Sequence, residues 1–364
     1  MTDLPPARPG AAAPSEPAAG PPSVVHLRDQ WYIACAGGDL TDEPVPFRLM
    51  GTPLVLFRDE VGAPSALLDR CPHRMVPLSL GGVVDGQLEC GYHGWRFDGG
   101  GVCRAVPGLC SSEEGRSRDV PRYPAAESDG YVWVYATPGP DPETRPYKLP
   151  VLDEPGYLHV HRSVTFEGTV HASLENALDV PHTAFLHRGL FRGGREPVEI
   201  QAVMTRDESS VQTEFIGEPR PPGLAAKILS PSGGMVTHYD RFMLPSIAQV
   251  EYRIGTENHI VTTSMATPVD DFETKMFAVV SLKLRLPTWL LRPVIEPFAM
   301  QIFRQDAWIL KEQTIAIERW GGERFQSTEI DLMGAQILRL LKRSASGKLG
   351  PDTEPWRKEI RLKV

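Results

Sequence analysis

Short runs of mostly apolar residues, separated by Gly and Asp, extend from about residue 31 to residue 138. Runs of this length between turn residues are typical of strands in an antiparallel sheet. The strongest turn signal is Asp98-Gly99-Gly100-Gly101. We predict strands at 31–36, 53–58, 65–69, 87–89, 95–97 and 131–136. Together they indicate a small all-β domain.

A Pro-rich segment, 138–155, separates these runs from a second region with longer periodic segments. There we predict strands near 158–167, 199–216, 236–266 and 275–285, and helices near 173–187, 298–319 and 328–343. This pattern indicates an α+β domain with an antiparallel sheet flanked by helices. We place the two domains at residues 26–140 and 141–364, with the Pro-rich segment as the linker.

The first 25 residues are mostly Pro, Ala, Gly and Ser. Such a segment cannot bury enough apolar surface to offset the entropy of ordering, so we predict a disordered tail at 1–25. It lacks the apolar core of a signal peptide. Five cysteines without such a signal argue against a disulfide framework and for a cytoplasmic location.

Charge and hydropathy exclude two classes of partner. The net charge of −8 argues against a nucleic-acid-binding surface. No apolar stretch is long enough to span a bilayer.

Two short motifs each offer one thiolate and one imidazole, Cys71-x-His73 and Cys90-x₂-His93. Two Cys and two His form the ligand set of a Rieske [2Fe–2S] centre, in which histidines replace cysteines on one iron. The alternative is a zinc site, but structural zinc usually pairs Cys with Cys and His with His along the chain. Because each motif here mixes the two, we favour the iron–sulfur interpretation. Cys35, Cys103 and Cys110 are predicted to be ordinary thiols.

A second group of polar residues lies on the predicted helix near 173–187. Asn176, Asp179 and His182 are spaced three residues apart, and His187 follows five residues after His182. An ideal α-helix would point the two histidines about 140° apart. They can share a metal only if the helix opens, and Pro181 removes a backbone donor there. We therefore predict an irregular helix with a π-type bulge.

A third ligand is needed, because facial non-haem iron sites use two histidines and one carboxylate. Asp306 is the one charge on a predicted helical stripe whose other members are Ala299, Phe303, Leu310, Gln313 and Ile317. A buried carboxylate needs a partner or a metal. The alternative leaves Asp306 hydrated, with His182 and His187 as core residues.

These motifs resemble the oxygenase component of the Rieske non-haem iron oxygenases. The likeness in length and layout is to the homotrimeric monooxygenase group that includes dicamba monooxygenase and vanillate O-demethylase. The resemblance is carried by the Cys71-x-His73…Cys90-x₂-His93 motif, by Asn176-x₂-Asp179-x₂-His182-x₄-His187, and more weakly by Arg304-Gln305-Asp306. It implies a catalytic domain with a helix-grip-like fold.

The resemblance also implies a mechanism. Electrons from NAD(P)H pass through a reductase, with or without a ferredoxin, to the Rieske cluster. They reach a mononuclear Fe(II) held by His182, His187 and Asp306, which activates O₂ to hydroxylate or demethylate a small organic substrate. Head-to-tail homotrimers bring one subunit's cluster to its neighbour's iron through Asp179, and Asn176 lies near the iron.

Two alternatives stay open. A Rieske electron carrier would need only the first domain, so the second ligand set argues against it. Other relatives use the same site for dihydroxylation, N-oxygenation, desaturation or oxidative cyclisation. We expect an apolar or aromatic substrate in a pocket between the sheet of residues 199–285 and the two ligand helices. Phe185, Leu186, Phe242 and Met243 are candidate lining residues.

Overall fold

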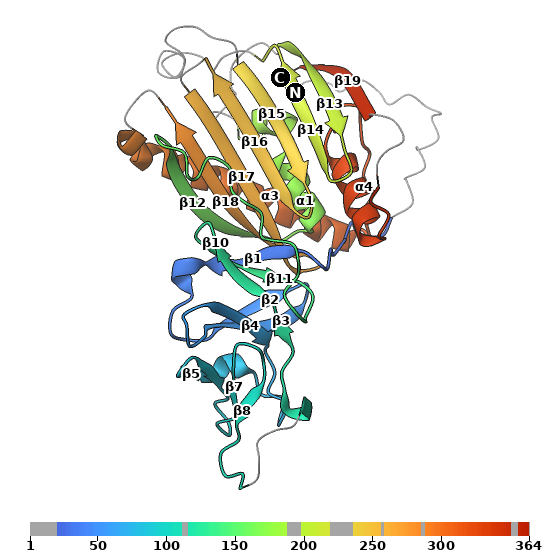
Figure 1. The fold of residues 1–364 in the computed structure, drawn as a ribbon. Coiled ribbons are helices and arrows are strands. Elements are labelled where there is room, and N and C mark those ends of the chain that lie inside the picture. Colours follow the sequence, from blue (N-terminus) through green and yellow to red (C-terminus); the bar gives the residue numbers. More distant parts are fainter. Residues whose placement is uncertain are drawn as a thin grey trace, which may run out of the picture.

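In the computed structural model the described residues are 20–110, 116–187, 198–218, 236–255, 258–284, 288–350 and 356–363. Figure 1 shows an elongated lower part made of short strands and an upper part built on one large sheet. The predicted fold class, an all-β domain followed by an α+β domain, is confirmed.

Three small antiparallel sheets form the described part of the N-terminal domain. The first contains β1 (Trp31–Ala36), β11 (Tyr131–Tyr135) and β10 (Ala125–Ser128). The second contains β2 (Val45–Leu49), β3 (Thr52–Arg58), β4 (Pro64–Leu68) and β9 (Arg122–Tyr123). The third contains β5 (Gly82–Val84), β6 (Gln87–Glu89), β7 (Arg96–Phe97) and β8 (Cys103–Ala105). Single 3₁₀ turns are η1 (Gly37–Asp39), η2 (Leu78–Leu80) and η3 (Arg116–Arg118).

The second sheet stands between two hydrophobic cores. Successive side chains of a strand point to opposite faces, and along β3 the buried residues alternate between the cores, Leu54 and Leu56 in one and Val55 and Phe57 in the other. The core on the Val55 side also contains Cys71 and Cys90. The packing of the β-domain itself therefore holds the two cysteines in place.

Eight strands form the large sheet of the second domain, and every neighbouring pair is antiparallel. In spatial order they are β12 (Leu158–Phe166), β18 (Glu273–Lys283), β17 (Asn258–Asp270), β16 (Ile247–Ile254), β15 (Val236–Met243), β14 (Ser210–Ile216), β13 (Glu199–Arg206) and β19 (Trp356–Lys363).

Helices cover one face of this sheet (Figure 1). Among the described residues these are α1 (Val170–Ala177), the 3₁₀ turn η4 (Pro181–Ala184), α3 (Thr288–Arg319) and α4 (Gly334–Ala345). The largest core lies between them and the sheet, where Leu174 of α1, Phe242 of β15 and Ile337 of α4 are completely buried. This packing fixes α1, which leads into the segment that carries His182 and His187, against the centre of the sheet.

The opposite face of the large sheet packs directly on the β-domain. A shared core joins Ile33 and Trp133 of the first sheet to Met265 and Phe277 of the large one. Backbone hydrogen bonds add to it, since Met50 N donates to Pro268 O at 2.8 Å. The two domains are thus joined by a buried apolar interface.

Part of the predicted linker belongs to this interface. Leu149 is buried in the shared core, and its backbone N–H donates to Asp129 Oδ2 at 2.8 Å. The proposed boundaries at 26–140 and 141–364 stay predictions, but the chain between the domains runs packed against both of them.

Residues 20–25 correct the predicted disordered tail; residues 1–19 lie outside the described residues. Ser23 donates from its backbone N–H and its hydroxyl to the two carboxylate oxygens of Glu323, at 2.7 and 2.6 Å. Val25 packs on the largest core, in which the adjoining Leu27 is buried. This segment is ordered because it gains a charged hydrogen-bond acceptor and an apolar surface that composition alone does not reveal.

The predicted strands of both domains are present within a few residues of their expected positions. Several short strands were missed, and so was the C-terminal strand β19, which pairs with β13 along its whole length. The helix expected at 298–319 starts earlier, at Thr288, and so includes Pro293 and Pro297.

Candidate metal centres

The two Cys–His motifs form loops with the same backbone hydrogen bonds. In the first, Cys71 N donates to Val76 O and Met75 N donates to Cys71 O, both at 2.9 Å. In the second, Cys90 N donates to Trp95 O at 2.8 Å and Gly94 N donates to Cys90 O at 2.9 Å. The fifth residue of each loop, Met75 or Gly94, has a positive φ. The shared hydrogen-bond pattern gives the two loops the same fold.

Within these loops the thiols lie inside and the imidazoles lie closer to the surface. Cys71 and Cys90 are each 2% exposed. The rings of His73 and His93 lie 4.5 Å apart between centroids, and Trp95 stacks on His73 at 4.9 Å. The sequence prediction that the four residues come together is in agreement with this geometry.

The electrostatics of the loops suit metal ligands. Burial raises the pKa of the Cys71 thiol, while the backbone amides of His73 and Arg74 donate toward its sulfur and lower it. Desolvation and the neighbouring His93 and Arg74 lower the pKa of His73, which favours the neutral imidazole that a metal requires. Nδ1 of His73 is buried and has no hydrogen-bond partner. Two thiols and two imidazoles fit the [2Fe–2S] group.

The second site begins where α1 ends. Thr169 caps the helix by accepting a hydrogen bond from Ala172 N at 3.1 Å. The helix stops at Ala177, and Pro181 opens the separate 3₁₀ turn η4. The predicted irregularity is present, but the predicted π-type bulge is wrong. A break and a tighter turn bring His182 and His187 together, with their Nε2 atoms 3.1 Å apart.

Asp306 of α3 completes a three-residue group with these histidines. Its Oδ1 lies 3.2 Å from His187 Nε2 and 3.6 Å from His182 Nε2. The side chains of Asp306 and His187 are only 9% and 2% exposed. Among the described residues this is the group whose ligand atoms converge closely enough to hold one metal ion.

One buried oxygen atom and two pKa shifts test whether a metal fits. Asp306 Oδ1 is buried without a hydrogen-bond partner, although it faces both imidazoles. Burial alone would raise the pKa of Asp306, but the two histidines beside its carboxylate lower it and keep the carboxylate charged. Burial would lower the pKa of His182, but Asp179 and Asp306 outweigh it and raise that pKa to about 9. Two imidazoles and a charged carboxylate fit a divalent iron.

The outer nitrogen of each imidazole faces a different partner. His182 Nδ1 lies 3.3 Å from Asp179 Oδ2. His187 Nδ1 lies 2.8 Å from Gln305 Oε1. Sequence reasoning quoted Gln305 only as a neighbour of Asp306 and assigned it no role. The sequence did contain a signal for Gln305. Its amide side chain is next to Asp306 on the same helix, and from there it can reach the outer nitrogen of a ligating histidine.

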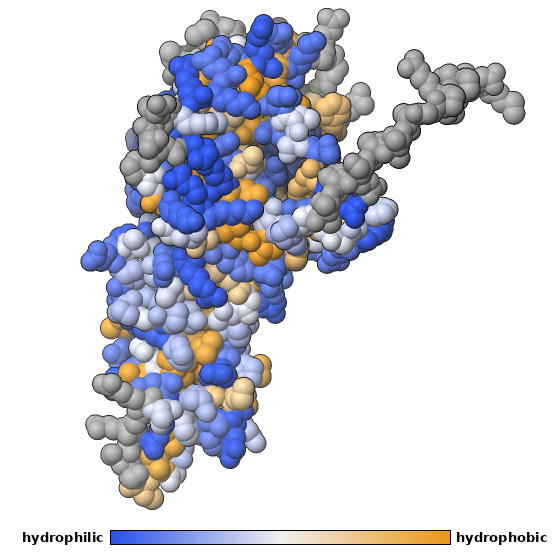
Figure 2. Space-filling view, turned by 90° about the vertical axis from the view of Figure 1, so that its right-hand side faces the viewer, coloured by the Kyte–Doolittle hydropathy of each residue, from blue (hydrophilic) through white to orange (hydrophobic). Residues whose placement is uncertain are grey.

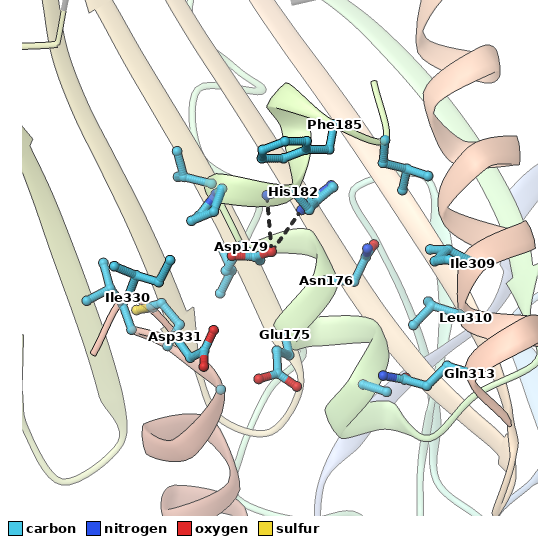
Figure 3. Close-up of a pocket in the computed structure, with 18 of the residues that line it drawn as sticks. Glu175, Asn176, Asp179, His182, Phe185, Ile309, Leu310, Gln313, Ile330 and Asp331 are labelled. Carbon is cyan, nitrogen blue, oxygen red and sulfur yellow. Dashed lines mark hydrogen bonds and ion pairs between the residues drawn. The ribbon is translucent and has the colours of Figure 1, made fainter. Parts of the chain in front are cut away.

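A cavity of about 440 Å³ opens beside His182. Figure 3 shows Asp179 and His182 at its upper side, with Glu175 and Asp331 pointing toward each other below them and Asn176 nearby. Burial, together with the neighbouring Asp179 and Asp331, raises the pKa of Glu175. The cavity therefore has an acidic wall.

The position of this cavity differs from the expected pocket. Its walls come from α1, η4, α3 and residues 330–334, and the large sheet contributes Phe215. Of the candidate lining residues, Phe185 and Leu186 line it. Phe242 belongs to the core, and Met243 packs on the interdomain core.

A further buried histidine lies on the sheet. His238 of β15 is stacked between Phe215 and Tyr252, with ring centroids 4.5 and 4.0 Å away. Its nitrogens meet Glu218 Oε2 at 2.6 Å and Asp240 Oδ1 at 2.9 Å. These contacts give His238 a structural role in the sheet, apart from both ligand sets.

Two surface properties bear on partners. Among the described residues no helix combines the length and apolar character needed to cross a membrane. On the face shown in Figure 2, hydrophilic residues predominate and hydrophobic ones form smaller areas.

Comparison with known families gives two matches along the chain. Residues 30–124 match the Rieske [2Fe–2S] domain, and residues 166–346 match the vanillate O-demethylase oxygenase C-terminal domain. The first match contains both Cys–His loops, and the second contains His182, His187 and Asp306.

Three curated proteins illustrate the similarity. A chlorophyllide a oxygenase of Chlamydomonas reinhardtii is 43% identical over 46% of this chain and 26% of its own. The oxygenase component of dicamba O-demethylase from Stenotrophomonas maltophilia is 34% identical over 45% of this chain and 49% of its own. The oxygenase subunit of 3-chlorobenzoate-3,4-dioxygenase from Comamonas testosteroni is 30% identical over 71% of this chain and 60% of its own. The matches span about a quarter to three fifths of these relatives.

Among solved structures, dicamba monooxygenase bound to 3,6-dichlorosalicylic acid superimposes with a TM-score of 0.75. The superposition covers 89% of this chain and 99% of that one, at 23% sequence identity. At that identity the likeness extends to the fold.

Proposed function

Because this chain belongs to the Rieske oxygenases, with a Rieske domain followed by the catalytic domain of the alpha subunit, we propose that it is the oxygenase component of a multicomponent system. It takes electrons that a partner reductase or ferredoxin derives from NAD(P)H. It uses them with O₂ to mono-oxygenate, by hydroxylation or demethylation, an aromatic or other small organic substrate.

One observation carries the proposal: a single chain holds two separate ligand sets. The Cys71 and Cys90 loops suit a cluster that handles single electrons. His182, His187 and Asp306 converge on one point with the donor set of non-haem iron oxygenases. A Rieske electron carrier needs only the first set, so the second argues against that alternative.

Seven residues would hold the two metal centres. Cys71, His73, Cys90 and His93 would hold the [2Fe–2S] cluster. His182, His187 and Asp306 would hold Fe(II), which when bound supplies open positions for O₂. Inserting one oxygen atom into a C–H bond reduces the other to water and consumes two electrons and two protons.

The remaining site residues act on these ligands. Asp179 orients His182 and keeps its imidazole basic, as a carboxylate behind a ligating histidine does. Asn176 lines the cavity beside Asp179, where its amide is available to water or substrate.

Mono-oxygenation is the finer part of the proposal. Its support is the structural likeness to dicamba monooxygenase and the match to the vanillate O-demethylase C-terminal domain. A dioxygenase subunit aligns over 71% of the chain, so dihydroxylation is the second candidate. N-oxygenation, desaturation and oxidative cyclisation stay as alternatives at the same site.

We also propose that the chain works as a head-to-tail homotrimer. The cavity beside Asp179 has acidic walls, and its rim exposes Phe185 and Ile330. The tip of the β-domain offers the complement, with Arg74 exposed next to His73 and with exposed Met75 and Tyr92. A second copy of this chain therefore fits the cavity by charge and by apolar surface.

A cytoplasmic location is kept as a prediction. The curated chlorophyllide a oxygenase relatives are described as chloroplastic, so the family does not determine the compartment.

The test is a substrate screen with a surrogate reductase, in which O₂ uptake is followed together with product mass. A gain of one oxygen or loss of a methyl group supports the proposal, and a gain of two oxygens supports the dioxygenase alternative. Iron analysis addresses the class itself: we expect three irons per chain, whereas two would indicate an electron carrier.

A further inference from the structure

Both ring nitrogens of His187 are held by consecutive residues of α3. Nε2 lies 3.2 Å from Asp306 Oδ1, and Nδ1 lies 2.8 Å from Gln305 Oε1. The His187 side chain is 2% exposed, and residues of one helix contact its imidazole from two sides. The sequence motif explains only the contact with Asp306 and not the contact with Gln305.

His187 lies just after a short turn of the backbone. The turn η4 ends at Ala184, and the backbone amides of Phe185 and Leu186 both donate to His182 O. His187 follows this turn and lies outside any helix. The side-chain contacts of His187 therefore contribute to the orientation of its ring.

We propose that Gln305 is a positioning residue for the iron site. Its amide oxygen accepts the Nδ1–H of His187, which leaves Nε2 as the unprotonated nitrogen that faces His182 and Asp306. A hydrogen bond to the outer nitrogen of a ligating histidine fixes both tautomer and ring orientation. This inference rests on the proposed function, because it assumes that the three residues hold iron.

The neutral amide also suits the charge of the site. A divalent ion brings two positive charges, and Asp306 and Asp179 supply two negative ones. His187 is more deeply buried than His182, whose side chain is 20% exposed. A third carboxylate behind His187 would leave an unbalanced charge where burial is greatest. Gln305 supplies the acceptor without the charge, so the two imidazoles become unequal ligands.

The test measures Fe(II) affinity by anaerobic competition with a chelator, on the full-length protein with its Rieske cluster intact. Gln305→Leu keeps the shape of the side chain and removes the acceptor. We expect about a 10- to 100-fold loss of affinity, the usual effect of removing such a partner, and an unchanged Rieske spectrum. Gln301→Leu, an exposed glutamine one turn earlier on α3, is the matched control and should keep full affinity.

A second readout separates orientation from general stability. In the Co(II)-loaded protein the visible absorption bands report ligand geometry, so Gln305→Leu should change them while Gln301→Leu should not. Gln305→Glu restores an acceptor of the same reach and should recover most of the affinity, less the cost of its added charge. Gln305→Asn is one methylene shorter and should not. If Gln305→Leu fails to fold, this Glu and Asn pair decides the question.

The inference is overturned if Gln305→Leu binds Fe(II) as the wild type does, or if the Glu and Asn variants bind alike. Asp306→Ala distinguishes this outcome from failure of the proposed function. If Asp306→Ala loses iron while Gln305→Leu keeps it, only the role of Gln305 is wrong. If Asp306→Ala also keeps the iron, the site itself is wrong.

Discussion

Asp179 contacts His182 twice through one oxygen atom. Oδ2 of Asp179 lies 3.3 Å from Nδ1 of the His182 imidazole and accepts a hydrogen bond from its backbone N–H, also at 3.3 Å. These are the two dashed lines in Figure 3. The side chain of Asp179 is 34% exposed, so it connects a buried ligand to the surface of the cavity.

Replacing Asp179 by Asn should leave both metal centres in place and slow turnover by about 10- to 100-fold or more. The amide keeps the shape of the carboxylate but removes the charge that orients His182. Iron analysis and the Rieske spectrum check the metals, and single-turnover oxidation of the mononuclear iron checks electron transfer. Asp331→Asn removes a carboxylate from the same proposed contact surface without touching His182, so it controls for any loss of assembly. Unchanged single-turnover kinetics in Asp179→Asn would refute the bridge.

Replacing His182 by Ala should remove the mononuclear iron and leave the Rieske spectrum intact. The two ligand sets lie in different domains with separate cores, so loss of one centre should not disturb the other. Iron content and visible absorption measured on the same sample check this. Loss of both centres would show that the domains do not hold their metals independently.

Reversing the charge of Arg74 to Glu should weaken assembly and slow multiple turnover. The exposed guanidinium lies beside His73, and the proposed contact surface carries Glu175, Asp179 and Asp331. The wild-type rate should fall with added salt, because exposed charge pairs are screened. The variant should be slower at low salt and less sensitive to salt. Equal sedimentation and equal salt dependence would contradict the proposed contact.

Stability should decrease as the pH rises from neutral to alkaline values because of His238. Burial alone would lower the pKa of His238, but Asp240 and Glu218 outweigh it and raise the pKa to about 9. The folded protein therefore holds this proton more tightly than the unfolded chain, whose histidine pKa is about 6.5. The contribution is complete below about pH 6.5 and is lost as the pH rises through about 9.

The contribution of His238 to the free energy of unfolding is on the order of 3 kcal/mol, at about 1.4 kcal/mol per pKa unit. Unfolding midpoints between pH 6.5 and 9.5 measure it. His238→Gln removes the titrating group and should flatten this part of the profile. An unchanged slope in the variant would assign the effect to other groups.

Truncating Phe277 to Ala should destabilise both domains together. Phe277 is 3% exposed in the interdomain core and meets Tyr131 at 5.8 Å between ring centroids. Removing a buried Phe costs about 3–5 kcal/mol. Far-ultraviolet dichroism and the Rieske absorption should lose signal at one lowered temperature. Trp320→Ala, at a site 64% exposed, is the control and should shift the midpoint little.

The elements with a strong local signal could be predicted from the sequence. The run 31–36 is confirmed as β1, and the segment 158–167 as β12, because a short apolar run in the first and alternation in the second indicate a strand locally. β19 was missed because its residues, largely exposed and charged, take strand geometry by pairing with β13. That pairing depends on contacts across the sheet.

In the candidate site, too, the features with a local signal could be predicted and those that depend on distant contacts could not. Residue types and spacing were sufficient to select His182, His187 and Asp306, since a single charge on an apolar stripe is conspicuous. How the histidines meet was not predictable, because Pro181 permits either a bulge or a break and the surrounding packing decides between them. Gln305 was missed although its place beside Asp306 was visible, because its partner His187 is 118 positions away in the sequence.

The apolar core between Ile33, Trp133, Met265 and Phe277 has a genetic consequence. It holds the cluster-bearing tip at the end of the β-domain away from the large sheet (Figure 1), so a chain cannot turn its own cluster toward its own iron. If electrons cross between chains, two inactive alleles should complement each other. Co-expression of a chain lacking Cys71 with a chain lacking Asp306 would yield mixed assemblies with some intact cluster–iron pairs, and activity would return although no single chain is functional.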